Sequence, residues 1–254
     1  MRKLDLIALD NIPLISPGDK LADVIFKSIN KSELIIDEGD ILVLAQKIVS
    51  KAEDRYVSLN KITPSGEAEL LAKKTAKDPR LVELILQESK EVVRYRKGVI
   101  VVENKLGFVH ANAGIDRSNI DSNANNPMVL LLPENPDLSA EGIRKDLSRL
   151  LKKPIGIIIN DSAGRAWRNG IVGIAIGSSG VTALTDLRGQ KDLYGKVLEV
   201  TEVGLADELA SAASILMGQG DEGLPVVLIK GLQLGEDKEG SQILIRPVED
   251  DLFR

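Results

Sequence analysis

The stretch KPIGIIINDSAGRAWRNGIVGIAIG, residues 153–177, decides the fold that we expect for this chain. It contains an apolar run over 155–159, a polar triplet over 160–162 and a second apolar run over 171–176. A β-branched run of this length between Pro and Gly predicts a buried strand. Side chains at the carboxyl end of such a strand reach solvent from a fixed backbone, which favours a metal or phosphate site at Asp161. A solvated turn explains the same polar residues equally well.

Apolar runs on both sides of this stretch predict a series of short strands and helices. Strands are expected over 4–9, 41–45, 99–102, 128–132, 197–203 and 226–229. Helices are expected to start at the capping residues Asp19, Ser65, Asp78 and Ser139, and a fifth is expected over 205–217. The alternation of the two patterns predicts a mixed α/β (α+β) fold.

The length of 254 residues fits one large domain or two small ones. No clear linker interrupts the chain, so we expect a single unit over 1–254 and leave open a division into two subdomains. Residues 235–254 form a charged C-terminal tail. No stretch has the pattern of a signal peptide or the length of a membrane span, so we expect a cytoplasmic protein without a membrane partner.

Composition excludes several classes of function. The chain has no cysteine and a single histidine, His110, which rules out disulfides, zinc–thiolate sites, cysteine nucleophiles and multi-histidine metal sites. The formal net charge of -5 argues against a protein that coats nucleic acid, because such domains are usually basic. No P-loop, GxGxxG, HExxH or GxSxG motif is present.

Oxygen-bearing side chains are the remaining candidates for chemistry. Carboxylates, hydroxyls and amides suit Mg²⁺ or Mn²⁺, which leave coordination positions for nucleotide phosphates. Residues of this kind that follow apolar elements are Asp116, Asp161, Ser162 and Gln219. Their pattern predicts metal-assisted phosphate chemistry without a P-loop.

Two further stretches could meet phosphate. Glycines in the loop 218–223 let backbone N–H groups approach an anion closely, although a helix C-cap followed by a turn explains them as well. Lys47 and Lys51 follow a predicted strand, and a solvated face is the alternative for this pair. Arg165 and Arg168 are positioned in the sequence to meet anionic groups, or to form a structural ion pair.

Longer motifs resemble one protein family along most of the chain, from Ile12 to Leu232. They are ILVLAQKIVSKAE (41–53), DPRLVELILQES (78–89), GFVHANAGIDRSN (107–119), LLLPENPDLSAEGIR (130–144), NDSAGRAWRNGIVGIAIG (160–177), DLRGQKDLYGKVLEVT (186–201) and ADELASAASILMGQGDEGLPVV (206–227). In this order they are similar to the GTP-dependent coenzyme F420-0:L-glutamate ligases, the F420 γ-glutamyl ligases.

The resemblance implies a reaction and its participants. GTP would phosphorylate the terminal carboxylate of the deazaflavin coenzyme F420-0, and the amine of L-glutamate would displace phosphate from the acyl phosphate. Further γ-linked additions are possible in the family. Mg²⁺ or Mn²⁺ would assist, and a role for K⁺ is left open. The implied fold is the family's mixed α/β architecture in an intertwined homodimer.

The resemblance also implies roles for individual residues. Asp116, Asp161, Ser162 and Gln219 match divalent-metal ligands, and we assign the catalytic role to Asp116 and Asp161, with Arg165 and Arg168 added from their sequence position. Positions that match the GTP site are Ile12, Pro13, Leu14, Ile15, Gln46, Lys47, Lys51, Asn119, Met217, Gly218, Gln219, Gly220, Asp221, Glu222, Gly223 and Leu224.

The chain departs from the family pattern at a few positions. Members commonly read DTxGRPWR where this chain has DSAGRAWR, so Ser162 keeps the hydroxyl while Ala163 and Ala166 alter the expected substrate pocket. Gln219 stands where many members have Glu, which removes one negative charge. Two alternatives therefore stay open: a paralogous amino-acid ligase for another carboxylate, and a non-catalytic nucleotide-binding protein on the same fold.

Overall fold

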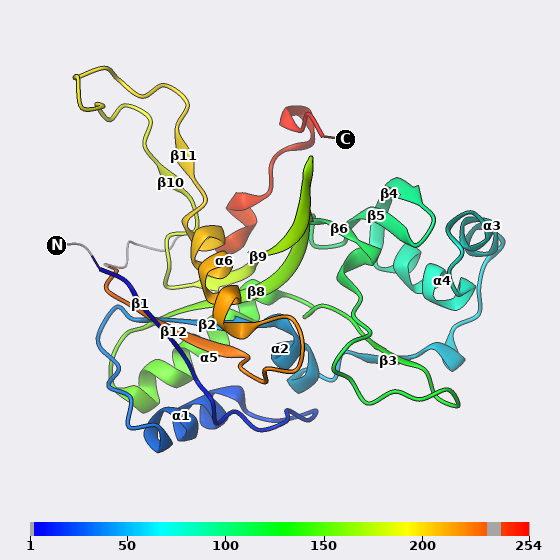
Figure 1. Ribbon diagram of the computed structural model, residues 1–254, viewed down its shortest axis with the longest axis horizontal. Coiled ribbons are helices and arrows are strands. Elements are labelled where there is room, and N and C mark those ends of the chain that lie inside the picture. The colour runs from blue at the N-terminus through cyan, green and yellow to red at the C-terminus, as the bar shows by residue number, and fades with distance from the viewer. Residues whose placement is uncertain (1–2, 233–239, 254) are drawn as a thin grey trace.

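The computed structural model describes residues 3–232 and 240–253, and its largest element is a five-stranded sheet (Figure 1). The strands lie in the order β1–β12–β2–β8–β9. β2 and β8 pair in parallel, whereas the other neighbours are antiparallel. The bounds of these strands are Asp5–Ala8, Val226–Lys230, Ile41–Ala45, Gly156–Arg165 and Arg168–Ser179, in sheet order.

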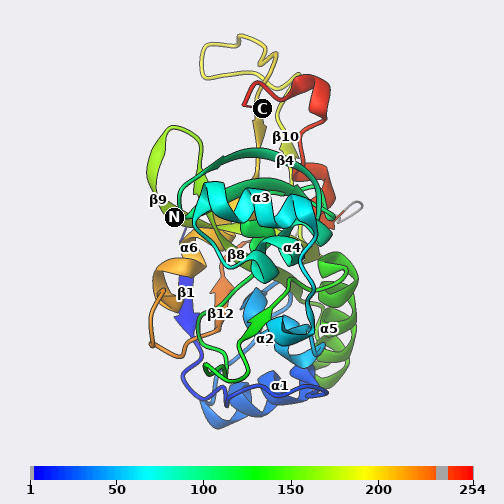
Figure 2. The same cartoon turned by 90° about the vertical axis from the view of Figure 1, so that its right-hand side faces the viewer.

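Helices cover both faces of this sheet, which is why its central strands are apolar on both sides. Leu42 and Leu44 of β2 face the core shared with α1, α2 and α5, and Ile41 and Val43 face the core under α6. Figure 2 shows α6 and α5 on opposite sides of the strands. The helices are α1 (Leu21–Lys31), α2 (Gln46–Ala52), α5 (Pro136–Leu151) and α6 (Leu205–Met217). The predicted mixed α/β class is confirmed.

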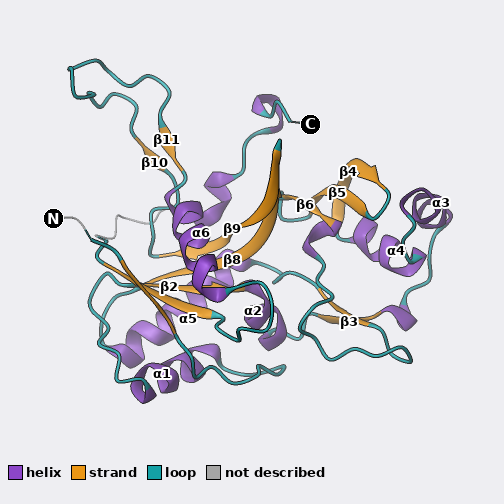
Figure 3. Cartoon of the chain, in the orientation of Figure 1, coloured by secondary structure: helices purple, strands orange, loops and turns teal. Residues whose placement is uncertain are grey.

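A separate hydrophobic core lies in a second lobe formed by the middle of the chain (Figure 3). Leu71, Ile85 and Ile100 are buried there, on two helices and a strand that pack together. The elements of this second lobe are β3 (Tyr56–Ser58), α3 (Gly66–Thr75), α4 (Pro79–Gln87), β4 (Ser89–Arg96), β5 (Val99–Asn104), β6 (Val109–Ala111) and β7 (Met128–Leu130).

The β8–β9 hairpin contains the polar triplet that the sequence placed after a buried strand. The apolar part of β8 is buried as predicted, but the strand continues through Asp161 and Ser162 to Arg165. Parallel pairing with β2 ends at the Ala45–Asn160 pair, beside a bulge, while antiparallel pairing with β9 continues. The triplet is therefore not a turn. It lies where β8 loses one of its two neighbours.

The predicted strand over 197–203 is wrong. Only Glu202–Val203 (β11) is extended, paired with Thr185–Asp186 (β10), and residues 187–201 project from the body as a long loop (Figure 1). The carboxylate of Asp192 accepts the backbone N–H groups of two nearby residues at 2.8 Å, which folds the loop on itself. The segment folds back on residues 187–191 through separate backbone contacts, such as the bridge between Lys191 and Val197, which do not form a continuous strand ladder.

Two of the four predicted helix caps are confirmed. Ser65 accepts the N–H of Ala68 at the start of α3, and Asp78 accepts that of Arg80 at the start of α4. Asp19 is not a cap, since its carboxylate accepts the N–H of an earlier turn residue. The Asp19 side chain thus makes its hydrogen bond within the turn and not with the first N–H groups of the helix.

The predicted cap of α5 at Ser139 is also wrong. Asn135 accepts the N–H of Leu138, and Pro136 occupies the first helical position, where its missing N–H costs nothing. In the predicted charged tail, residues 240–244 and 248–250 form short 3-10 helices, and residues 235–239 and 254 lie outside the described residues. Within residues 3–232 and 240–253 no helix has the length and apolarity to cross a bilayer.

Gly173 tests how closely α6 packs on the hairpin. A Cβ atom there would lie 2.5 Å from the carbonyl oxygen of Ala210 and from the side-chain oxygen of Asn160. We predict that Gly173→Ala lowers the free energy of unfolding by roughly 1–3 kcal/mol, the usual cost of overpacking. Urea unfolding measures the change. Gly164→Ala, where a Cβ meets no atom within 4 Å, is the matched control, and equal stability of both variants would contradict the close packing.

Candidate functional site

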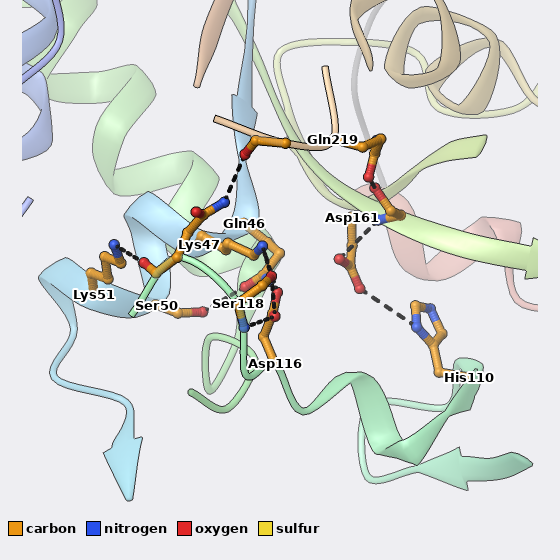
Figure 4. Close-up of polar contacts among 12 residues, drawn as sticks. Gln46, Lys47, Ser50, Lys51, His110, Asp116, Ser118, Asp161 and Gln219 are labelled. Carbon is orange, nitrogen blue, oxygen red and sulfur yellow. Dashed lines mark hydrogen bonds and ion pairs between the residues drawn. The ribbon is translucent and has the colours of Figure 1, made fainter. Parts of the chain in front are cut away.

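Segments that are far apart in sequence meet where β2 ends and β8 loses its neighbour. The N–H of Ala45 donates to the oxygen of Pro225 at 2.8 Å, so the loop that precedes β12 lies beside the start of α2. The loop after β1 is held to the same place, because the N–H of Leu9 donates to the oxygen of Val226 at 2.9 Å. Figure 4 shows the side chains that converge there.

Two lysines of α2 reach the segment 116–119. The Nζ atom of Lys47 lies 3.0 Å from Oδ2 of Asp116 and 2.7 Å from the hydroxyl of Ser118. The Nζ atom of Lys51, one helical turn later, donates to the backbone oxygen of Asn119 at 2.7 Å. Burial, with the neighbouring charge of Lys47, lowers the pKa of Lys51. These lysines are therefore not a solvated face.

Asp116 is fixed by its own turn as well as by Lys47. Its Oδ1 atom accepts the N–H and the hydroxyl of Ser118, both at 2.9 Å, and its backbone bridges to Leu130 of β7. A carboxylate that accepts a backbone N–H two residues later forms an Asx turn. The carboxylate is thus oriented before any ligand binds.

Asp161 has a different environment. Its side chain is only 13% exposed, and burial raises the pKa of this carboxyl to about 7, with the Ser162 N–H opposing the shift and the charge of Asp116 adding to it. The Nδ1 atom of His110, on β6, lies 3.5 Å from its Oδ2. Burial lowers the pKa of His110 to about 4. The imidazole beside Asp161 is therefore neutral at neutral pH.

The loop after α6 completes the group. The hydroxyl of Ser162 donates to Oε1 of Gln219 at 3.0 Å, and Nδ2 of Asn119 donates to the backbone oxygen of Gly220 at 3.0 Å. The N–H of Gly220 donates to the carboxylate of Glu222 at 2.8 Å. The pKa of Glu222 is lowered by the N–H groups of Glu222 itself, Gly220 and Gln219. The loop therefore gathers backbone N–H groups around an anion, here its own side chain.

The four predicted metal ligands are brought together with oxygen donors only: two carboxylates, a hydroxyl and an amide. The charge of Asp116 acts on Asp161, so two carboxylates lie close enough to repel, with Lys47 as the nearby cation. Within the described residues no three side chains of His, Cys, Asp or Glu cluster as a metal site. The donor set suits a hard divalent cation such as Mg²⁺ or Mn²⁺ that also keeps water or phosphate ligands.

Other predicted residues border the site to differing degrees. Gln46 is buried, with its Oε1 accepting the hydroxyl of Ser50 at 2.9 Å. In the loop after β1, Ile15 is buried whereas Leu14 is 92% exposed. Met217 is buried at the end of α6, and its sulfur accepts Nδ2 of Asn160 at 3.4 Å. These residues support the walls of the site more than they present polar groups to it.

Arg165 and Arg168 are not brought to the other candidates. They pair across the tip of the β8–β9 hairpin, are exposed, and the guanidinium of Arg165 donates to the backbone oxygen of Asn169 at 3.3 Å. Arg165 lies four positions beyond Asp161 along β8, about 13 Å at roughly 3.3 Å per residue. Among the described residues neither arginine forms an ion pair.

Sequence reasoning missed two members of the group, Ser118 and His110. Ser118 stands two residues after Asp116, and this Asp-x-Ser spacing is itself a turn signal. As the single histidine of the sequence, His110 served only to exclude multi-histidine metal sites. Its contact with Asp161 joins strands of different sheets, so no local spacing announces it.

Comparison with known proteins places the chain among ligases. A family model described as "F420-0:Gamma-glutamyl ligase" matches residues 10–231, and the chain belongs to this family. It is 48% identical to the coenzyme F420:L-glutamate ligase of Methanocaldococcus jannaschii, over 100% of this chain and 98% of that protein. Proteins of the same name from Methanothermobacter thermautotrophicus (99% of each chain) and Archaeoglobus fulgidus (99% of this chain, 97% of the other) are 46% and 39% identical.

Because the carboxyl of Asp161 is buried, we predict that its ionised form lowers the free energy of unfolding of the metal-free protein. Its pKa rises from 3.8 to about 7, so its favourable contribution to folding is present below about pH 4 and is lost as the pH rises through 7. At about 1.4 kcal/mol per pKa unit, Asp161→Asn should stabilise the metal-free protein at pH 8 by roughly 2–4 kcal/mol.

Chemical unfolding in a chelating buffer at pH 8 and at pH 5 measures this difference. The advantage of Asp161→Asn should shrink at pH 5, where the wild-type carboxyl is protonated in the folded protein. The exposed Asp121 offers Asp121→Asn as a control that should change little at either pH. A destabilised Asp161→Asn at pH 8 would refute the buried-charge assignment.

Proposed function

We propose that this protein is a GTP-dependent ligase that joins L-glutamate to coenzyme F420-0, with further γ-linked glutamates as possible products. The relatives named coenzyme F420:L-glutamate ligase over nearly their full length support this substrate pair. The observation that carries the proposal is the convergence of Asp116, Asp161, Ser162 and Gln219 with the lysines of α2 at one end of the sheet.

The proposed reaction has two steps. An oxygen of the F420-0 carboxylate attacks the γ-phosphorus of GTP, and the bond to the β-phosphate oxygen breaks, which gives an acyl phosphate and GDP. The amine of L-glutamate then attacks the acyl carbon, phosphate leaves, and the amine loses a proton as the amide forms. Neither step needs a side-chain nucleophile, which agrees with a chain that has no cysteine.

The side chains of this chain would act by position and charge. Lys47 and Lys51 place two ammonium groups on one side of the site, where they would balance the phosphate charge. Asn119 and Gly220, joined by a hydrogen bond, would hold the loop of residues 217–224 against the nucleotide. The N–H groups that surround Glu222 offer contacts of the kind that an anionic ligand takes.

Asp116, Asp161, Ser162 and Gln219 would hold the divalent cation. A bound Mg²⁺ or Mn²⁺ would neutralise charge on the phosphate groups and orient them. The ammonium of Lys47 already balances Asp116, so a cation on Oδ2 of that carboxylate would compete with Lys47. Nothing in the donor set distinguishes a role for K⁺, which we keep as an optional activator.

We further propose a homodimer in the cytoplasm. The loop of residues 187–201 projects from the body and exposes Leu193 and Tyr194 almost fully, at 100% and 97%. Large apolar side chains at the end of a projection fit burial against a second copy. Sedimentation of the Leu193→Ser variant beside the wild type would test this, because a dimer held by the loop should weaken.

The experiment that tests the function measures phosphate release from GTP with Mn²⁺ and L-glutamate, with and without F420-0. Release that depends on F420-0, with a product heavier by one glutamyl unit, would support the proposal. Dependence on a different carboxylate would indicate a paralogous ligase. Metal-dependent GTP binding without release for any acceptor would indicate a binding protein on this fold.

Asp161→Asn should abolish ligation, because the amide cannot supply the negative charge that a divalent cation requires. Its unfolding curve, already part of the stability comparison, shows whether the variant is folded. Turnover and Mn²⁺ affinity near those of the wild type would remove Asp161 from the cation site.

Lys51→Ala should raise the KM for GTP roughly tenfold, since a charge-assisted contact contributes about 1.5–3 kcal/mol. Initial rates over a range of GTP concentrations measure it. Lys145→Ala, which removes an exposed lysine paired within α5, is the matched control and should leave KM unchanged. An unchanged KM in Lys51→Ala would mean that the lysine only holds the 116–119 segment.

A further inference from the structure

His110 is the only histidine of the chain, and it lies on β6 at the border between the second lobe and the large sheet. Its side chain is almost fully buried, with 3% exposed, and its ring meets that of Phe108 edge-on at 6.0 Å between centroids. Pairing with Val102 of β5 fixes its backbone. The ring therefore has a defined position beside Asp161 (Figure 4).

The two ring nitrogens have different surroundings. Nδ1 lies 3.5 Å from Oδ2 of Asp161, whereas Nε2 is buried with no hydrogen-bond partner among residues 3–232 and 240–253. A neutral imidazole carries its proton on one nitrogen only. A buried N–H without an acceptor is costlier and rarer than a buried acceptor without a donor. The surroundings thus favour a proton on Nδ1, directed at the carboxylate.

The carboxylate of Asp161 would then be held from two sides. Its Oδ1 accepts the N–H of Ser162 at 2.8 Å, and its Oδ2 faces His110. The separation of 3.5 Å exceeds an ordinary N–H···O hydrogen bond by a few tenths of an ångström, and such contacts commonly tighten when a ligand binds.

We propose that His110 is a positioning residue for the cation site: its Nδ1–H is directed at Oδ2 of Asp161 and fixes the orientation of this carboxylate. The part that concerns the cation rests on the proposed function. Asp116 and Asp161 are thus oriented by different means. Lys47 supplies an ammonium group that competes with a cation, while His110 supplies a ring N–H as donor. Partners behind metal ligands of this kind affect affinity strongly.

The position of the proton can be observed directly. In tag-free, metal-free protein at pH 8, long-range proton–nitrogen NMR correlations of the single histidine need no assignment. We expect Nδ1 to be protonated and pyrrole-like, and Nε2 to be unprotonated and pyridine-like. A ring whose proton is on Nε2, with Nδ1 unprotonated, would overturn the proposal.

The role in the cation site is tested by three substitutions and the dissociation constant for Mn²⁺. Asn places an amide N–H near the position of Nδ1, Gln places it near Nε2, and Phe keeps a ring without a donor. We expect His110→Asn to bind Mn²⁺ within roughly threefold of the wild type, and His110→Gln and His110→Phe to bind roughly tenfold more weakly.

The pattern across the variants separates positioning from simple packing. If His110→Phe fails to fold, the two amides still decide, because they differ mainly in where the donor lies. Equal affinity in His110→Asn and His110→Gln, or wild-type affinity in His110→Phe, would overturn the role of His110 alone. A wild-type protein that binds no Mn²⁺ would overturn the cation site as well, and so identifies failure of the proposed function.

Discussion

The pairing of β2 with β8 is the constraint on which the candidate site depends. These neighbouring strands run in parallel, so their carboxyl ends lie at the same edge, and the pairing stops at Ala45 and Asn160. Beyond that point β2 turns into α2 while β8 continues beside β9. Lys47, in the first turn of α2, and Asp161, on β8, are therefore held next to each other by the ends of adjacent strands. The second lobe brings Asp116 and His110 to the same edge, and the loop after α6 brings Gln219.

The site balances charge in two different ways. Asp116 forms a salt bridge with Lys47, whereas burial raises the pKa of Asp161, which lies beside the His110 imidazole, to about 7. A buried carboxyl without a charged partner costs stability unless it takes up a proton or meets a cation. The two acidic residues thus hold the site in a state of reduced negative charge when no ligand is present. Functional sites commonly contain such destabilised groups.

Much of the fold could be predicted from the sequence because the signals are local. The strands at 41–45 and 226–229 are continuous apolar runs, and the helix over 205–217 has a regular apolar face. The strand expected over 197–203 shows the limit, since alternation of apolar residues does not tell whether a continuous ladder of backbone hydrogen bonds forms with the neighbouring segment. Asp19 and Ser139 show a second limit: the Asp19 carboxylate accepts the N–H of a residue in the preceding turn, and Asn135 caps α5 in place of Ser139.

The site could be predicted in part for a related reason. Asp116, Asp161 and Gln219 follow apolar elements and lie in long motifs, so both position and resemblance selected them. Arg165 and Arg168 were selected by position alone, and the continuation of β8 carries them away from Asp161. His110 was overlooked because its partner lies on a strand of another sheet. Contacts of that kind depend on how two lobes pack, which no short window of sequence contains.

The place of β12 in the sheet has a consequence for how the chain is made. β12 lies between β1 and β2, yet it follows β2 by about 180 residues in the sequence. At roughly 5–20 residues per second, a ribosome needs on the order of 10–40 s to add that length. Throughout this interval the nascent strands β1 and β2 lack the neighbour that joins them. The large sheet can therefore close only after residues 226–230 have been made, whereas the second lobe, made from consecutive segments, can fold before that point.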